Sequence, residues 1–261
     1  MMKILKNAAM AACALSAFVA VDASAQTFVA LTGDRQLTMV DSKTGKAGAT
    51  MTMSGPAGKL IGVDVRPSDK KLYGLLADGT VVTIDTMTGA ATMKVKLQKT
   101  LAPGVEGSVD FNPVADRMRI IGVDGASLRA NVDDGMVATD GSLKYADADG
   151  QKGAAPRVTA AAYSNSAAGA TATTLYDIDG PIMSLTRQVP PNDGVLNTIG
   201  LMNVPTGPVA FDIAPVGVSG NIGMVVTGGF IYTVNLADGM LTRGPAVTGV
   251  RGAIRDIAIL P

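Results

Sequence analysis

The sequence predicts an all-β protein, a five-bladed β-propeller of four-stranded blades, closed by pairing the C-terminal strand with the first blade. Three observations predict this fold. A strand motif recurs along the chain, each copy is followed by the same succession of strands and glycine turns, and the two chain ends complement each other. Composition agrees, because 31 glycines favour tight turns and every acid except Glu106 is an aspartate, a turn residue rather than a helix former.

The recurring motif is an apolar strand with a polar residue near its centre and, in the clear copies, a proline at its end. Clear copies occupy residues 62–67, 108–113 and 210–215, and a degenerate copy occupies 160–165. Asp64, Asp110 and Asp212 hold the same position in the clear copies, and Ala162 holds it in the degenerate one. The copies recur about every 50 residues, which fits the length of a propeller blade.

Each motif copy begins a unit with the same internal order, which is clearest in the unit that starts at residue 60. Residues 71–76 form an expected strand, 77–79 a turn, 80–85 a second strand and 91–97 a third, with a turn at Gly89 between the last two. Together with the motif strand, this makes four strands per unit, joined by glycine-containing hairpins.

The last turn of each unit has its own signature, an Asp or Asn four residues before a glycine. The pairs are Asp41 and Gly45, Asp85 and Gly89, Asn131 and Gly135, and Asn235 and Gly239, while Pro190 replaces the acid before Gly194. The Asx side chain can bond backbone amides of the turn, and glycine supplies the positive φ. We therefore interpret these aspartates as turn-forming residues and not as catalysts.

The chain ends predict closure of the ring. Residues 27–31 match the second strand of a unit, whereas 255–259 match an opening strand with no unit after it. Pairing the two completes the first blade and removes open sheet edges. We expect a single domain over residues 26–261, with blades at 27–53 plus 252–261, 60–97, 107–143, 158–202 and 209–247.

The N-terminus predicts export. Lys3 and Lys6 precede an apolar run at 8–21, and a small-residue cleavage site ends at Ala25. We expect a signal peptide over 1–25, cleaved after Ala25, and a periplasmic or secreted protein with no membrane span. A retained anchor and a lipoprotein box ending at Cys13 are the alternatives. Cys13 is the only cysteine, so the mature chain would have no disulfide.

Several runs give the sequence a family resemblance. They lie at 60–67, 109–121, 158–165, 172–179, 190–194 and 231–239, and they resemble the bacterial exported family known as domain of unknown function 4394. The similarity extends over residues 27–261. The resemblance implies an exported, β-propeller-like protein and carries no established activity.

Composition excludes several classes of function. Lys and Arg number 22, equal to Asp and Glu, so no basic field exists for nucleic acid or anionic lipid. The absence of histidine excludes Ser-His-Asp and Cys-His catalysis, and no Cys remains for a zinc site after signal cleavage. No nucleotide-binding or hydrolase motif is present. An enzyme of this sequence would depend on carboxylates, arginines, lysines and tyrosines.

The motif aspartates are the leading site candidates. Asp64, Asp110, Asp212 and Asp256 are expected at equivalent positions on the innermost strands of four blades. They could converge on the central channel and hold Ca²⁺. Alternatively, each could bond backbone amides or an arginine of the neighbouring blade and lock the blades together, which we favour because side chains of a strand alternate between faces. Residues adjacent to the ring positions are expected in the inter-blade core: Phe111, Tyr163, Phe211 and Ile257.

Other charged residues give weaker candidates. Glu106 and Asp110 could be the acid and base of a glycosidase, if their separation suits it. The acidic pairs at 147–149 and 177–179 fail as EF-hands, because no acid occupies the twelfth loop position. The connection over 144–157 has room to be a binding loop. Four arginines could pair with the aspartates or bind an anionic ligand: Arg66, Arg117, Arg119 and Arg129.

These observations favour an exported propeller of the cell envelope that binds a small ligand or an envelope protein, or serves as a scaffold. We expect a monomer without enzymatic activity or cofactor, Ca²⁺ being the one candidate ion. The alternative is a carboxylate- or metal-assisted hydrolase or lyase that acts on an envelope or extracellular glycan. A third possibility is a purely structural role in an envelope assembly.

Overall fold

The fold is that of a computed structural model, which describes residues 26–217 and 220–261. The predicted signal peptide, with its anchor and lipoprotein alternatives, lies outside the described residues. Within them, no helix has the length and apolar character needed to cross a membrane.

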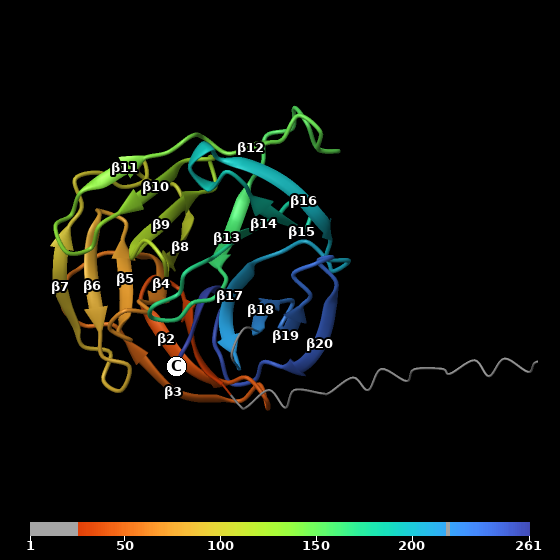
Figure 1. Cartoon of the computed structure of the whole chain (residues 1–261). Coiled ribbons are helices and arrows are strands. Elements are labelled where there is room, and N and C mark those ends of the chain that lie inside the picture. The colour runs from red at the N-terminus through yellow and green to blue at the C-terminus, as the bar shows by residue number, and fades with distance from the viewer. Residues whose placement is uncertain (1–25, 218–219) are drawn as a thin grey trace, which may run out of the picture.

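The structure confirms a five-bladed β-propeller (Figure 1). Blade 1 contains β21 (Ile254–Ile259), β1 (Thr27–Thr32), β2 (Gln36–Asp41) and β3 (Ala47–Thr52). Blade 2 contains β4 (Leu60–Val65), β5 (Leu72–Leu76), β6 (Thr80–Ile84) and β7 (Ala91–Lys96). Blade 3 contains β8 (Gly107–Asn112), β9 (Arg117–Gly122), β10 (Ser127–Ala130) and β11 (Val137–Thr139). Blade 4 contains β13 (Val158–Tyr163), β14 (Leu175–Asp179), β15 (Ser184–Gln188), the short helix η1 (Pro191–Asp193) and β16 (Val195–Leu201). Blade 5 contains β17 (Val209–Val216), β18 (Gly220–Thr227), β19 (Phe230–Val234) and β20 (Leu241–Ala246).

Closure through the last strand is also confirmed. Strand β21 pairs antiparallel with β1, and Phe28 lies opposite Ile259. The innermost strands then contact one another in a complete circle, in the order β21, β4, β8, β13 and β17. This circle surrounds the central channel.

The connection between blades 3 and 4 is more ordered than a free binding loop. It begins with β12 (Lys144–Tyr145), which pairs in parallel with β16 and adds a fifth strand to blade 4. Further along, Asp149 accepts hydrogen bonds from the N–H and the hydroxyl of Thr198, at 2.5 and 3.0 Å. Part of the connection therefore serves blade 4 structurally.

The core lies between the blades. Phe111, Tyr163, Phe211 and Ile257 are all buried, as the sequence predicts. Tyr73 of blade 2 meets Phe111 of blade 3 edge to face, with ring centroids 5.2 Å apart. Burial of such side chains stabilises the fold by about 1.5–3 kcal/mol each.

The glycines of the Asx-x-x-x-Gly turns join neighbouring blades at the outer rim. Gly135 of blade 3 has φ +78°, and a Cβ there would lie 2.5 Å from the carbonyl oxygen of Lys96 in blade 2. Gln98 N–H donates to the carbonyl of Gly135 at 3.0 Å. Glycine is therefore required at this position for two reasons: the positive φ of the turn and the close approach of the neighbouring blade.

The same rim contact closes the ring. Gly45 of blade 1 has φ +69° and would place a Cβ 2.0 Å from the carbonyl oxygen of Ala246 in blade 5. Thr248 N–H donates to the carbonyl of Gly45 at 2.9 Å. The first and last blades thus make the same glycine contact at the rim as blades 2 and 3.

Candidate functional site

Three of the four predicted ring aspartates converge in the channel. Asp64 on β4, Asp110 on β8 and Asp212 on β17 are all at least 95% buried. One carboxylate oxygen from each lies within 4.8 Å of the others. The repeat places them there because the same register position of each innermost strand faces the same side of its blade.

Each of these carboxylates also bonds the next blade. Asp64 Oδ2 accepts the N–H of Phe111 at 2.7 Å, and Asp110 Oδ1 accepts the N–H of Tyr163 at 3.0 Å. Asp212 Oδ2 accepts the N–H of Ile259 at 2.6 Å. The inner edge of an innermost strand has no further strand to pair with, so these carboxylates satisfy N–H groups that would otherwise be buried unpaired. Convergence and blade locking therefore occur together.

The expectation that Asp256 shares this ring position is wrong. Asp64 accepts the N–H of Phe111, the residue after the ring position Asp110. Asp212 likewise accepts the N–H of Ile259, the residue after Ala258. Ala258 thus holds the ring position of blade 1, and Asp256 lies two residues earlier on β21. Residues two apart on a strand face the same side, so alternation in the sequence could not distinguish the two positions.

Asp256 belongs to a second level of inter-blade contacts. Its Oδ2 accepts the N–H of Val63 at 2.9 Å, and at the same level Ser108 Oγ accepts the N–H of Ala161 at 3.1 Å. Burial raises the pKa of Asp256 well above its ordinary value. The metal candidates of the channel are accordingly Asp64, Asp110 and Asp212.

Among the described residues, the three ring carboxylates are not bonded to a cationic side chain. In the part of the chain that the structure describes, no lysine or arginine donates a hydrogen bond to any of them. Burial, followed by the neighbouring carboxylates, raises the pKa values of Asp64 and Asp110 well above the ordinary range. Burial raises the pKa of Asp212 to about 6. The ring therefore favours protons or a bound cation.

A cavity of about 460 Å³ opens onto two of these acids. Asp64 and Asp212 line it, together with residues that follow the ring position on the innermost strands, residues of the connections after β4 and β13, and Gln26. Most of the walls are apolar, and the lining includes Val65, Pro67, Ile213, Ala214, Ile259 and Leu260. Lys70 and Ser166 add polar groups to the lining. The cavity is therefore small and mostly apolar, with two acids in its lining.

Glu106 and Asp110 lie in different surroundings. Glu106 precedes β8, where its half-exposed carboxylate forms ion pairs with Lys59 and, at 3.5 Å, with Arg255. Asp110 lies within the same strand, buried and bonded to backbone. The strand residues that line the cavity come after the ring position, whereas Glu106 comes before it. Glu106 therefore lies toward the opposite end of the channel.

Three of the four predicted arginines pair with other aspartates instead of the ring. Arg66 bridges Asp116 and Asp133 of blade 3 at 2.6 and 2.7 Å. Arg119 and Arg129 share the carboxylate of Asp140, at 2.5 and 2.7 Å. Separately, Arg117 donates to the backbone carbonyls of Ala115 and Asp116. Their donors are engaged within the protein, which leaves little for an anionic ligand.

Asp177 is a buried acid that sequence reasoning missed. The sequence predicts residues 177–179 as the acidic end of a strand that runs into a turn, without an expectation of burial. Asp177 lies within β14, fully buried, and neither carboxylate oxygen has a hydrogen-bond partner among the described residues. Burial raises its pKa to about 8, although the charge of Arg119 acts to lower it. The alternation of β14 places Asp177 on the same face as the apolar Leu175, a signal that could have indicated burial.

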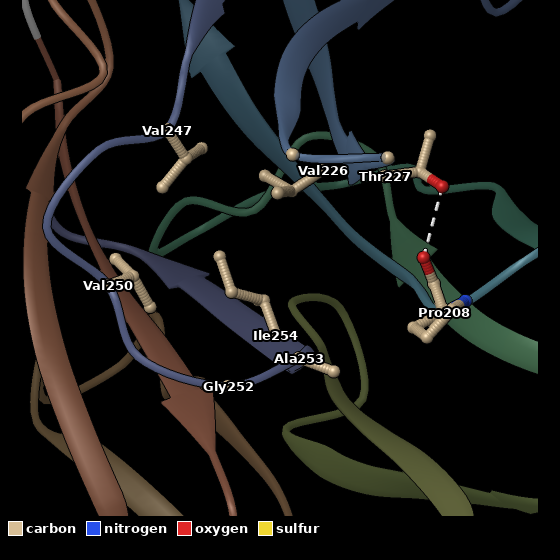
Figure 2. A pocket seen from close by; sticks show the side chains of 10 residues that line it. Pro208, Val226, Thr227, Val247, Val250, Gly252, Ala253 and Ile254 are labelled. Atoms are coloured by element: carbon tan, nitrogen blue, oxygen red, sulfur yellow. Dashed lines mark hydrogen bonds between the residues drawn. The ribbon is translucent and has the colours of Figure 1, made fainter.

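A second, smaller hollow lies where blades 5 and 1 meet (Figure 2). Its volume is about 260 Å³. Val226, Val247, Val250 and Ile254 extend into it, and Thr227 Oγ1 donates to the carbonyl of Pro208 at 3.0 Å. The lining of this hollow contains no charged side chain, and its one hydroxyl, that of Thr227, already donates to Pro208.

Comparison with known proteins identifies a family for the sequence and relatives for the fold. The family model described as "Domain of unknown function (DUF4394)" matches residues 36–258. The search of curated proteins found no match.

One solved structure shares the architecture at low sequence identity. A protein of unknown function from Bacteroides thetaiotaomicron VPI-5482 is 14% identical, with a TM-score of 0.51, over 84% of this chain and 55% of its own. This chain thus spans about half of that protein. Another, from Bacteroides caccae, is 12% identical, with a TM-score of 0.46, over 88% and 76% of the two chains. The likeness to the first shows the fold alone.

Proposed function

This chain belongs to the DUF4394 family, and on that premise we propose that it is an exported, non-enzymatic propeller that binds a small ligand at one end of its central channel. The observation that carries the proposal is the cavity of about 460 Å³ that ends on the buried carboxylates of Asp64 and Asp212. Small-ligand sites are typically concave, a few hundred Å³ in volume and mostly apolar, with a few buried polar groups that orient the ligand.

Binding is proposed instead of catalysis because of where the acids lie. The Glu106 carboxylate is held in ion pairs at the other end of the channel, while Asp110 bonds the backbone of blade 4. General acid and base groups must both reach the reacting atoms of one substrate. Ligand binding in the cavity lined by Asp64 and Asp212 requires no such pair of groups.

Export is the part of the proposal that rests on residues 1–25. Its support is the charged start, the apolar run and the small residues before Gln26. The mass of the protein recovered from the periplasm or medium tests it. We expect a monomeric chain that begins at Gln26; a chain with residues 1–25 intact and retained in the cytoplasm would contradict export.

Ligand binding is tested by screening a library of small fragments against protein with ¹³C-labelled isoleucine and alanine methyl groups. We expect some fragments to shift the methyl resonances of Ile213, Ile259 and Ala214, which line the cavity. Ala167→Trp, a large substitution at an exposed lining residue, is expected to abolish these shifts.

The matched control is Ala148→Trp, at an exposed alanine that does not line the cavity. It should bind the fragments as the unmodified protein does. The proposal fails when no fragment perturbs the cavity resonances, or when Ala167→Trp binds as well as Ala148→Trp.

A further inference from the structure

The channel ring brings three acids together, and no lysine or arginine of the described residues is bonded to any of them. Asp64, Asp110 and Asp212 bring carboxylate oxygens within 4.8 Å of one another, and all three side chains are buried. Buried charges require a partner or a proton, because desolvation disfavours the isolated ionised group. No lysine or arginine of the described residues bonds to the ring, so a cation that enters the channel meets uncompensated carboxylates.

One ring oxygen is also left without a hydrogen bond. Asp110 is only 4% exposed, and its Oδ1 accepts the N–H of Tyr163. Across the described residues, no donor reaches Asp110 Oδ2. A carboxylate oxygen that lacks a donor is an unfilled acceptor, and Asp110 belongs to the cluster whose two other acids line the cavity.

The number of acceptors fits an ammonium group better than a calcium ion. Ca²⁺ takes six to eight oxygen ligands. The ring supplies only three carboxylates, because Ala162 and Ala258 hold the two remaining positions. Backbone N–H groups already bond all three carboxylates and leave only Asp110 Oδ2 without a donor among the described residues. A primary ammonium has three N–H donors. Charge-assisted N–H···O bonds are about 2.7–2.9 Å long, which places three acceptors around one nitrogen within the observed spacing.

The walls of the cavity favour an organic body attached to that ammonium. Val65, Ile213, Ile259 and Leu260 line the space next to the acids. A bare metal ion gains nothing from aliphatic walls, whereas an apolar group buried against them gains about 25 cal/mol per Å² of surface removed from water. Lys70, also in the lining, disfavours a second positive charge on the ligand.

We propose that the cavity binds a small primary amine in its ammonium form, with the –NH₃⁺ group bonded to Asp64, Asp110 and Asp212 and the apolar body against the cavity walls. This inference rests on the proposed function and names the chemical class of the ligand. Ionised carboxylates bond the ammonium most strongly. Because burial and the neighbouring carboxylates raise the pKa values of Asp64 and Asp110, we expect protons held by the ring to be released to solvent when the ammonium binds.

The test compares amines with their neutral counterparts by isothermal titration calorimetry and by the methyl resonances of the cavity. The probes are n-butylamine and 2-phenylethylamine, the corresponding alcohols, and calcium chloride alone, all at pH 7.5. We expect each amine to bind at least about tenfold more tightly than its alcohol, with proton release that appears as a dependence of the measured heat on the buffer.

Two conservative variants locate the site. Asp212→Asn and Asp110→Asn, checked for folding by circular dichroism, should each weaken amine binding at least about tenfold. The matched control is Asp177→Asn, the same change at another buried aspartate outside the channel, which should leave amine binding unchanged.

The outcomes separate this inference from the proposed function. If amine and alcohol bind equally, or if neutral or acidic fragments bind better than amines, the ligand is not an amine. The proposal that the cavity binds a small ligand is then unaffected. Tight Ca²⁺ binding that Asp212→Asn abolishes replaces the amine with a metal ion. Both proposals fall together only when no probe or fragment perturbs the cavity. The comparison of amine with alcohol in the unmodified protein needs no variant to fold.

Discussion

The carboxylate of Asp256 occupies the space that a side chain on Gly62 would need, because a Cβ on Gly62 would lie 2.4 Å from Asp256 Oδ2. The same oxygen accepts the N–H of Val63 at 2.9 Å. Gly62 lies on β4 of blade 2, and Asp256 lies on β21, the strand that completes blade 1. The missing side chain therefore lets the closing strand bond the next blade.

This relationship predicts the effect of Gly62→Ala. The methyl group must displace Asp256 and break its bond to Val63, so the free energy of unfolding should fall by about 1–3 kcal/mol, as for other overpacked sites. Urea unfolding measures it. Gly150→Ala is the control, because a Cβ there meets nothing within 4 Å. Equal stability of the two variants would contradict the shared space.

The rim turns predict that Gly135→Ala is more destabilising than Gly104→Ala. Both glycines have similar positive φ, +78° and +81°, so both variants incur a backbone strain of about 1–2 kcal/mol. Only at Gly135 would the methyl group also approach a carbonyl oxygen, that of Lys96, at 2.5 Å. The difference in unfolding free energy between the variants measures the inter-blade contact; no difference would mean that the turn alone requires glycine.

The raised pKa values predict that stability falls as pH rises from about 4 to about 8. Asp177 has a pKa of about 8 in the folded protein and about 4 when unfolded, so the folded state binds the extra proton in this range. Asp212, at about 6, adds to the same trend. Asp177→Asn cannot ionise, and we expect it to stabilise the protein at pH 8 and to change little at pH 4.5.

Urea unfolding of the unmodified protein and of Asp177→Asn at both pH values measures this effect. Asp140→Asn serves as contrast, since it weakens the ion pairs with Arg119 and Arg129 and should destabilise the protein at pH 8. A stability gain from Asp177→Asn that is equal at pH 4.5 and pH 8 would show that the carboxyl does not titrate between them.

Arg119 predicts a large loss on conservative replacement. Its buried guanidinium bonds Asp140 at 2.5 Å and, across the interface with blade 4, the hydroxyl of Tyr163 at 3.2 Å and Asn192 at 3.1 Å. Lysine keeps the charge but cannot reproduce this fork of donors. Arg119→Lys should reduce the unfolding free energy by about 3 kcal/mol.

The matched control for Arg119 lies on the same strand. Arg117→Lys changes a more exposed arginine that bonds only nearby backbone carbonyls, and it should be close to neutral. Unfolding in guanidinium chloride compares the two variants. A similar effect of both substitutions would contradict the role of Arg119 between the blades.

The sequence predicted the blades because they depend on local rules. Strand alternation, glycine turns and the repeated motif act within about 50 residues, and the complementary ends leave one way to remove open edges. The Asx turns also follow locally, as in Thr88 N–H donating to Asp85 Oδ1 at 2.8 Å. Three ring aspartates followed from the same repeat, because equivalent residues of equivalent strands meet around the axis.

Contacts between blades were decided only by the tertiary structure. The position of Asp256 beside Gly62, the burial of Asp177 and the pairing of Arg66 with Asp116 and Asp133 all depend on how one sheet docks on the next. The sequence by itself determined the number of blades, their closure and the repeat that carries the acids. Docking determined which acids converge, which remain unpaired and where a cavity opens, because side chains far apart in sequence compete there for the same space and the same hydrogen bonds.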